Sequence, residues 1–387
     1  MQIDRRAQIL MVAIFLAVIL APGLIQAVFE LRDGEWPRAL DVFLRPPTAQ
    51  NLHAYERSLE ETSLVIKQLR PGMQYFQWRF LADAGEKAVV GRDGWLFYRP
   101  SVRYLVEGQT GAPEDDSTDP LLAIRSFRDQ LGARQIRLLL VPVPDKESIY
   151  PEMLAGRAEG AGIVVCERTR LLLDRLEQSG IEYVDLFEVF RRARQQESRS
   201  DPGRLYLAQD SHWSPEGVRA ATVAVARRVL DAGTIVRGNH AYTERPVTVR
   251  RQGDLVQMLR VPQIERALEP ESVTCSQVIE AGEGMPYRDA TDSEVLILGD
   301  SFLRIYEQDE PESAGFISHL ARELGRPLTS IVNDGGASTL VRQALAGRPA
   351  LLKNKRLVIW EFAEREIRFG IEGWKIVPLV RPGTTSR

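Results

Sequence analysis

The chain has 387 residues, 44% of them hydrophobic and 27% charged, which fits one large α/β domain with additions, or two domains, around a sizeable core. Its formal net charge of −3 at pH 7 provides no general attraction to phosphate backbones, so nucleic acid is not expected as a partner. With two cysteines, no CxxC spacing and four histidines, the sequence offers few ligands, and we predict neither a metal site nor another cofactor.

The N-terminal segment has the pattern of a membrane anchor. Arg5 and Arg6 precede an uncharged run from Ile9 to Phe29, which has about the length that a helix needs to cross the hydrocarbon core. A cleaved signal peptide would have a shorter apolar region and a small residue where this chain has Ile25. We therefore predict an uncleaved transmembrane anchor over residues 1–29. The basic pair keeps its tip in the cytoplasm and sends the rest of the chain into the periplasm.

Residues 30–87 favour helix, and we predict that they form a helical stalk or cap. The pair Pro46-Pro47 interrupts this segment. Apolar residues then follow one another at helical spacing, namely Leu52, Leu59, Ile66 and Leu69. A turn at Gly91–Gly94 leads into the short aromatic strand Trp95–Tyr98, so we expect a catalytic domain over residues 88–387.

Within this domain, apolar runs of strand length alternate with helical patterns. The predicted strands are Ile136–Val143, Ile181–Leu186, Val295–Leu298, Leu328–Val332 and Leu357–Phe362. The predicted helices lie near Pro120–Ala133, Glu167–Ser179, Pro215–Asp231, Ser313–Leu324 and Leu340–Ala346. This alternation predicts a three-layer α/β fold, with a mainly parallel sheet between two layers of helices. Residues 233–292 are rich in Arg, Pro and Gly, break the alternation and are interpreted as an insertion.

One of the predicted strands is followed directly by a serine. Val295–Leu298 leads into Gly299-Asp300-Ser301, a tight turn at the carboxyl end of the strand, where reactive groups gather in open parallel sheets. A hydroxyl is a weak nucleophile unless a base removes its proton, so a catalytic Ser301 requires a histidine and a group that orients it. Gly-Asp-Ser is also common in ordinary turns, and alone it decides little.

The segment Asp210-Ser211-His212 supplies the other two groups. Ser214 and Pro215 suit a helix N-cap and a first helical position, so His212 is predicted to lie in the loop before a helix. Asp210 is two residues away and projects to the same side, which lets its carboxylate orient the imidazole. The alternative is a simple ion pair at the helix entry. We favour a triad of Ser301, His212 and Asp210 because these settings coincide in a chain poor in histidine.

Other candidate nucleophiles and bases have weaker settings. Cys166 begins an amphipathic helical pattern and has no histidine near it in sequence, so a cysteine nucleophile is disfavoured. We expect Cys166 and Cys275 to be buried free thiols, since free cysteine is among the most buried residue types. The other histidines, His53, His240 and His319, lack comparable neighbours.

The Gly-Asp-Ser turn and the Asp-x-His pair resemble motifs of the SGNH hydrolase superfamily. In most of its members the histidine follows the serine, whereas here Asp210 and His212 precede Ser301. This reversed order is similar to the permuted SGNH-like domain of the periplasmic alginate O-acetyltransferases. The segments Gly91–Phe97 and Pro144–Pro151 and the N-terminal anchor also resemble that group, and the resemblance covers about residues 88–365.

The resemblance implies an O-acetyltransferase that moves acetyl groups onto hydroxyls of a secreted polysaccharide, alginate or a related exopolysaccharide, through an acetyl-serine. It also implies an O-acyltransferase of the inner membrane as the partner that supplies acetyl. The alternatives are an acetylesterase that uses water, and a non-catalytic polysaccharide-binding component of a secretion complex. A polyuronate would favour a basic groove, for which the candidate clusters are Arg191-Arg192, Arg227-Arg228 and Arg250-Arg251. For the first two clusters, a solvated helix face is the favoured interpretation.

The resemblance also points to donors for the oxyanion of the reaction. We expect the backbone amide of Ser301 to be one of them. A second amide would come from the segment Ile331–Ser338, where Gly336 and Ser338 are the candidates. Asn333 is a weaker candidate, because an asparagine in such a segment is more often a turn residue.

Overall fold

The computed structural model describes residues 4–37, 40, 44, 46, 48–62, 64–81, 83–107, 119–196 and 203–379. The chain divides into two units, Met1–Asp83 with Val261–Ile264, and Ala84–Arg260 with Glu265–Arg387. The first unit contains the helices α1 (Arg5–Arg32), α3 (Ala49–Thr62) and α4 (Leu64–Leu81). In the described part of the chain, the one helix long and apolar enough to cross a membrane is α1, over Gln8–Arg32.

The second unit is built on a four-stranded sheet that is parallel throughout. Its strands, in spatial order, are β3 (Arg137–Val143), β8 (Leu357–Ala363), β6 (Val295–Gly299) and β7 (Thr329–Val332). Every residue of β6 and β8 is buried, which explains why their sequences are almost continuously apolar. The predicted parallel sheet is therefore confirmed.

The predicted strand Ile181–Leu186 is wrong as an element of this sheet. Tyr183 forms only an isolated parallel bridge with Leu140 of β3, and helix α10 (Leu186–Gln196) begins where the strand was expected to end. The helix buries Leu186 together with Phe190, four residues later, so its first residues follow helical rather than strand periodicity. The apolar character of this segment alone does not distinguish a strand of the sheet from a single bridge followed by a helix.

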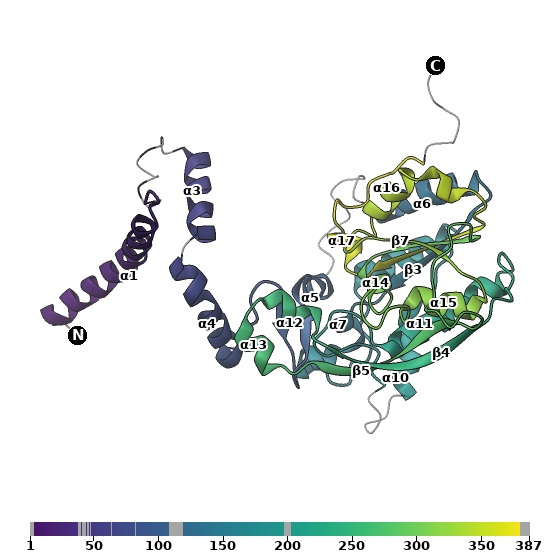
Figure 1. Cartoon of the computed structure of the whole chain (residues 1–387), viewed down its shortest axis with the longest axis horizontal. Helices are drawn as coiled ribbons and strands as arrows, with labels where there is room; N and C mark the ends of the chain where they lie inside the picture. The colour runs from purple at the N-terminus through teal and green to yellow at the C-terminus, as the bar shows by residue number, and fades with distance from the viewer. Residues whose placement is uncertain are drawn as a thin grey trace, which may run out of the picture. The chain divides into compact units, whose positions relative to one another are not determined.

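Alternate residues of each strand face opposite sides of the sheet and meet different helices. On one face, Ile297 and Ile359 belong to the same core as α10, α11 (Pro215–Asp231) and α15 (Phe316–Leu324). On the other, Leu298 and Trp360 pack with α6 (Pro120–Gly132), α9 (Glu167–Gln178) and α16 (Leu340–Ala346). Figure 1 shows α6 and α16 together on one side of the sheet, and α11 and α15 together on the other. The three-layer α/β arrangement is thus confirmed.

Residues 233–292 contain an antiparallel hairpin of β4 (Tyr242–Arg251) and β5 (Glu271–Glu280). The pairing runs from Tyr242 opposite Glu280 to Arg251 opposite Glu271, and the hairpin forms the long ribbon beside α11 and α15 in Figure 1. The helices α12 (Asp254–Leu259) and α13 (Pro262–Ala267) lie between the two strands in sequence. Pro246 is accommodated in β4 because this ribbon has only two strands, which leaves one edge of β4 unpaired.

The remaining described elements are short. They are β1 (Ala88–Val90), β2 (Leu96–Tyr98), α5 (Arg99–Val106), α7 (Lys146–Ile149), α8 (Pro151–Leu154), α14 (Ser301–Arg304), α17 (Glu366–Phe369) and two 3₁₀ turns at Gly156–Ala158 and Pro349–Leu352. Cys166 and Cys275 are buried and free, as predicted.

Candidate active site

Ser301 lies in the turn at the carboxyl end of β6, where the backbone is fixed from two sides. The amide of Asp300 donates to Oε2 of Glu361 on β8 at 2.9 Å, and the Asp300 carboxylate accepts from the amide of Phe302 at 2.9 Å. A Cβ on Gly299 would lie 2.2 Å from the same Glu361 oxygen, so a larger residue would displace the carboxylate that fixes the turn. The turn thus presents the Ser301 hydroxyl just beyond the strand end, and Ser301 is only 8% exposed.

The loop that carries His212 is fixed by the helix behind it. The hydroxyl of Ser214 accepts hydrogen bonds from the amides of Glu216 and Gly217, each at 3.2 Å, and caps α11 as its residue type predicted. The Trp213 ring is fully buried and meets the rings of Phe302 and Phe316 at centroid distances of 5.1 and 5.6 Å. This packing joins the histidine loop to the segment that follows Ser301.

The structure brings Ser301, His212 and Asp210 together. Nε2 of His212 lies 2.8 Å from the Ser301 hydroxyl oxygen, and Nδ1 lies 2.7 Å from Oδ1 of Asp210. Because an ionised carboxylate only accepts, Nδ1 carries a proton and Nε2 is left as the acceptor for the serine proton. The same Asp210 oxygen accepts from the His212 backbone amide at 3.1 Å, which fixes the carboxylate relative to the ring.

The charges of this group favour an ionised aspartate and a basic histidine. Burial opposes the charge of Asp210, but His212 and Arg251 beside it hold its pKa well below the usual range. Burial likewise opposes an imidazolium, but the carboxylates of Asp210 and Asp254 outweigh it and raise the pKa of His212. The histidine is therefore a stronger base than a solvated imidazole.

Two residues that the sequence did not identify complete the surroundings of Asp210. Nε of Arg251 donates to Oδ2 of Asp210 at 2.9 Å, and the Asp254 amide donates to the same oxygen at 3.2 Å. The Asp254 carboxylate accepts from the Ser211 amide at 2.7 Å and from its hydroxyl at 2.5 Å. Arg251 was predicted as part of a polymer-binding cluster, but its side chain is only 15% exposed and faces Asp210 instead.

Lys146, in the predicted Pro144–Pro151 segment, supports the same loop from α7. Its ammonium group donates to the carbonyls of Leu207, Ala208 and Asp210 at 3.0, 3.1 and 2.7 Å. Burial lowers the pKa of Lys146 to about 8, against the opposing effect of nearby carboxylates. The Lys146 ammonium group thus holds the backbone of this loop through hydrogen bonds and is not available as a nucleophile.

Comparison with known proteins identifies the family of this chain. The family described as an SGNH hydrolase-like domain, acetyltransferase AlgX, matches residues 88–364. The chain belongs to this family. A probable alginate O-acetylase AlgJ of Azotobacter vinelandii is 25% identical over 324 residues, covering 81% of this chain and 78% of that protein. The AlgJ of Pseudomonas aeruginosa is also 25% identical, over 322 residues, with the same coverage of 81% and 78%.

Solved structures of the AlgX-like family support the fold. The O-acetyltransferase domain of Pseudomonas putida AlgJ superposes with a TM-score of 0.57 at 22% identity, covering 73% of this chain and 92% of that one. Pseudomonas aeruginosa AlgX gives a TM-score of 0.53 at 18% identity, covering 71% of this chain and 62% of that one. The predicted SGNH hydrolase-like fold of the AlgX type is thereby confirmed.

The predicted oxyanion donors outside the serine turn of this AlgX-like chain are engaged elsewhere. The Gly336 amide donates to the Asn333 carbonyl at 2.9 Å, and the Ser338 amide donates to the Glu366 carboxylate at 2.7 Å. Both amides thus have hydrogen-bond partners within the protein, and Gly336 and Ser338 stay predictions as oxyanion donors. Asn333 is exposed, and its own amide donates to the Gly299 carbonyl at 3.0 Å. The amide of Ser301 stays a prediction.

Arg365 also lies beside the reacting groups and was not predicted. It follows β8, its Nη1 donates to the Asp145 carboxylate at 2.7 Å, and its guanidinium lies 5.7 Å from the centroid of the Phe302 ring. Its positive charge opposes protonation of His212. Arg365 lies in a loop after a strand, and the sequence around it contains no pattern that predicts a position near His212.

Among the described residues, Asp210, His212 and Asp254 have ligand-type atoms within 4.8 Å of one another. Their lone pairs already have hydrogen-bond donors, because Arg251 binds Asp210 and Ser211 binds Asp254. A guanidinium at this distance would also repel a cation. The three residues therefore fit a hydrogen-bonded relay better than a metal centre.

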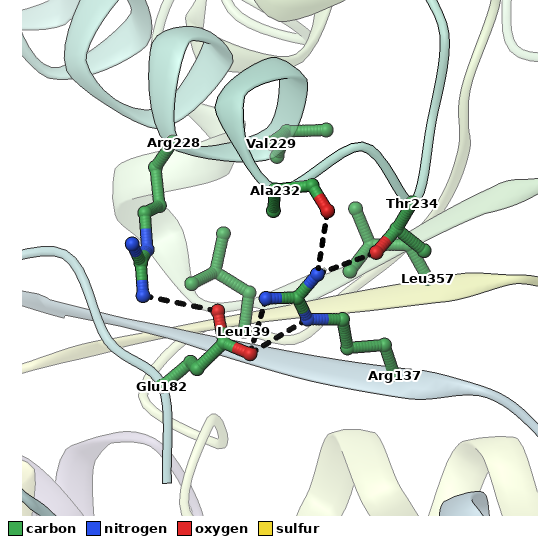
Figure 2. Close-up of a pocket in the computed structure, with 8 residues that line it drawn as sticks. All are labelled: Arg137, Leu139, Glu182, Arg228, Val229, Ala232, Thr234 and Leu357. Carbon is green, nitrogen blue, oxygen red and sulfur yellow. Dashed lines mark hydrogen bonds and ion pairs between the residues drawn. The ribbon is translucent and has the colours of Figure 1, made fainter.

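A small pocket lies near the amino ends of β3 and β8, whereas Ser301 follows the carboxyl end of β6 (Figure 2). Glu182 pairs there with Arg137 and Arg228, with Nη2 of Arg228 at 3.1 Å. Arg137 also donates to the Ala232 carbonyl at 3.3 Å and to the Thr234 hydroxyl at 2.5 Å. These charged and polar groups are hydrogen-bonded to one another. The pocket therefore connects α11 to the sheet, and its lining includes none of the residues around Ser301.

Proposed function

We propose that this chain is a polysaccharide O-acetyltransferase in which Ser301, His212 and Asp210 form the catalytic triad. The observation that carries the proposal is the continuous relay of 2.7 and 2.8 Å contacts from Asp210 through His212 to the Ser301 hydroxyl. Membership of the AlgX-like family supports the transfer of acetyl groups. The names of its relatives, probable alginate O-acetylases, support a polysaccharide acceptor.

The reaction proceeds in two halves. The Ser301 oxygen attacks the acetyl carbonyl of the donor while Nε2 of His212 takes the hydroxyl proton. Collapse of the tetrahedral intermediate breaks the bond to the donor's leaving group, which receives that proton, and leaves acetyl-serine. A sugar hydroxyl then attacks the acetyl-serine carbonyl, gives its proton to Nε2, and the Ser301 oxygen leaves and is reprotonated. Asp210 stabilises the imidazolium in both halves.

The acceptor is a hydroxyl of alginate or a related exopolysaccharide. Water is the competing acceptor, and the same triad would then act as an acetylesterase, because the choice depends on how the cleft excludes water and holds the sugar. A third alternative is a polysaccharide-binding component without turnover. The ordered relay at Ser301 favours chemistry over binding alone.

The site works in the periplasm, with α1 as a single-pass anchor in the bacterial inner membrane. The length and apolar composition of Gln8–Arg32 support a spanning helix, and Arg5 and Arg6 support a cytoplasmic N-terminus. Because acetyl-CoA is made in the cytoplasm, an O-acyltransferase within the same membrane supplies the acetyl group. This partner is the membrane component that the proposed reaction requires.

The proposal is tested with the full-length protein in detergent, an activated acetyl ester as donor and deacetylated uronate oligosaccharides as acceptors. The wild type should release the leaving group and add acetyl to the sugar, seen as a mass gain. Ser301→Ala should lower the rate at least about 10³-fold. Exposed Ser272 provides a matched control, and Ser272→Ala should leave the rate unchanged.

Three outcomes separate the alternatives. Ester cleavage without any mass gain on the sugar identifies an acetylesterase. Binding of the oligosaccharide without turnover identifies a binding component. Turnover that persists in folded Ser301→Ala would exclude Ser301 as the nucleophile.

A further inference from the structure

The segment Arg251–Asp254, at the end of β4 and the start of α12, lies in close contact with the Asp210 loop. An added Cβ on Gly253 would lie 2.0 Å from the Gln209 carbonyl oxygen, so the two backbones meet with no room for a side chain. On either side of this glycine, Arg251 and Asp254 both bond to the Oδ2 atom of Asp210. A hairpin outside the central sheet therefore contacts the proposed orienting acid directly.

Asp254 brings a second carboxylate to the histidine. Its Oδ2 lies 3.5 Å from Nδ1 of His212, beyond the 2.7 Å contact of Asp210 but close enough for a strong charge interaction. The two hydrogen bonds from Ser211 keep that carboxylate in place. Asp254 therefore favours the imidazolium that forms when His212 accepts the serine proton.

Arg251 has the opposite charge and the opposite effect. Its guanidinium lies 2.9 Å from Asp210 and also donates to Asp309 at 3.2 Å. Arg251 partly neutralises the charge of Asp210 and so limits the rise in the pKa of His212. It also reduces the repulsion between the carboxylates of Asp210 and Asp254. Two carboxylates in such close contact otherwise tend to share a proton.

We propose that Arg251 and Asp254 are positioning residues for the reaction at Ser301, with Asp254 the second carboxylate of His212 and Arg251 the counter-ion that limits their combined effect. This inference rests on the proposed function. It makes the inserted hairpin part of the catalytic machinery, and it assigns the two residues opposite influences on the proton affinity of one histidine.

Other charged groups around this segment belong to several elements, and they stay unchanged in the test. Asp254 faces Asp210, Lys146 and His212, while Arg251 contacts Asp210 and Arg365 acts on His212. Glu271 acts on the neighbouring Lys146. Burial and the neighbouring Asp210 raise the pKa of Asp254 to about 6, so its carboxylate is ionised at neutral pH.

The test measures the acid limb of the pH profile of kcat/KM for the full-length protein. Asp254→Asn removes a negative charge from His212 and should move that limb to lower pH by about one unit. It should also lower the plateau about tenfold, because the imidazolium formed in the transition state loses stabilisation. Arg251→Gln removes a positive charge and should move the limb to higher pH, and Arg251→Lys should restore it towards the wild type. The control Glu265→Gln removes an exposed carboxylate from α13 and should change neither value.

A second readout does not need turnover. The chain has four histidines, so NMR of the histidine-labelled protein resolves His212, identified by its loss in His212→Gln, and gives its titration midpoint directly. Opposite shifts in Asp254→Asn and Arg251→Gln support the inference. Equal shifts, no shifts, or lost activity with an unmoved midpoint overturn it. If circular dichroism shows that one variant fails to fold, the direction in which the other variant moves the His212 titration midpoint decides whether the inference holds. A wild type without turnover contradicts the proposed function alone.

Discussion

Asp210 and His212 use each of their polar side-chain atoms for a different partner. Oδ1 of Asp210 faces His212, while Oδ2 accepts from Arg251 and from the Asp254 amide. On the ring, Nδ1 faces Asp210 and Nε2 faces Ser301. The two shortest contacts favour one orientation of the ring and the tautomer with the proton on Nδ1, as a general base requires before substrate arrives.

The pH dependence of the reaction follows from the same residues. His212 must be neutral to take the serine proton, and its pKa is raised because Asp210 and Asp254 outweigh its burial. Activity should therefore rise with pH through a midpoint above about 6.5, the value of an unperturbed histidine. The measurement is kcat/KM for an acetyl ester from pH 5 to 9. Activity that stays flat down to pH 5 would contradict a general base at His212.

Another buried histidine does not obscure this measurement. Burial lowers the pKa of His319 to about 4, so it stays neutral across the range in which His212 changes charge. His319→Gln should therefore keep the wild-type midpoint.

Local signals in the sequence were enough to single out Ser301, His212 and Asp210, which the structure brings together, but not the residues around them. Ser301 follows a buried strand, and Ser214 with Pro215 marks the helix start behind His212, so both positions are encoded within a few residues. Arg251 and Asp254 reach Asp210 only because the hairpin folds back across a sequence separation of 41 and 44 residues. Nothing near them in sequence distinguishes a buried guanidinium from an exposed basic cluster.

Among the elements, those with terminal signals were predicted best. Helix α11 begins at Pro215 and ends at Asp231 as expected, because Ser214 caps it and proline fits the first turn. The segment Ile181–Leu186 has no such signal. One of its residues, Tyr183, forms a single bridge to β3, and Leu186 is already the first residue of α10. A short apolar run specifies burial without specifying the element that achieves it.

The contact between the hairpin and the histidine loop gives a prediction at the same scale. Gly253→Ala places a Cβ 2.0 Å from the Gln209 carbonyl oxygen, which belongs to backbone and cannot rotate away. The segment must move, so we expect activity to fall at least about tenfold, since small displacements at an active site are costly. Gly282→Ala is the matched control, because its added Cβ meets nothing within 4 Å. Equal rates in both variants would show that the hairpin contact is irrelevant to turnover.

Helix α15 is held by a buried carboxyl that makes stability depend on pH. The Glu307 carboxyl accepts from the amide and hydroxyl of Ser318, at 3.0 and 2.9 Å, near the start of α15. Burial raises the pKa of Glu307 to about 8, whereas in the unfolded chain it ionises near its ordinary value. The folded state therefore holds a proton that the unfolded state releases, and stability from this group is lost as pH rises from about 4.5 to 8.

Glu307→Gln removes that dependence while keeping an acceptor for Ser318. Between pH 5 and 8, the free energy of unfolding should fall less in the variant than in the wild type, by about 2 to 4 kcal/mol. Urea denaturation followed by tryptophan fluorescence measures the difference. Exposed Glu283 serves as the control, since Glu283→Gln should retain the wild-type slope. Parallel slopes for wild type and Glu307→Gln would contradict a protonated Glu307.

At the scale of the whole molecule, the chain combines an apolar N-terminal helix with an α/β unit whose own core is complete. The sheet residues of β6 and β8 are buried between two layers of helices of the same unit. The apolar side chains of α1 are in contrast exposed, with Phe15 at 63% and Val18 at 68%. An apolar surface of this length is stable in lipid rather than in water, which gives α1 a separate role from the catalytic unit.

The proposed membrane anchor makes a prediction about the first residues of the chain, which should control its orientation. With Arg5 and Arg6 held in the cytoplasm, alkaline phosphatase fused after the last residue should be active, because that enzyme matures only in the periplasm. Replacing both arginines by glutamate should lower the reporter activity several-fold, since the charge difference across the helix then no longer favours this orientation. Replacing the exposed Arg219 and Arg227 of α11 by glutamate provides the control, because charges far along the chain from the spanning helix contribute little to its orientation. A fusion that is inactive in the wild type, with the protein still in the membrane fraction, would place the Ser301 site in the cytoplasm, where an exported polysaccharide could not reach it.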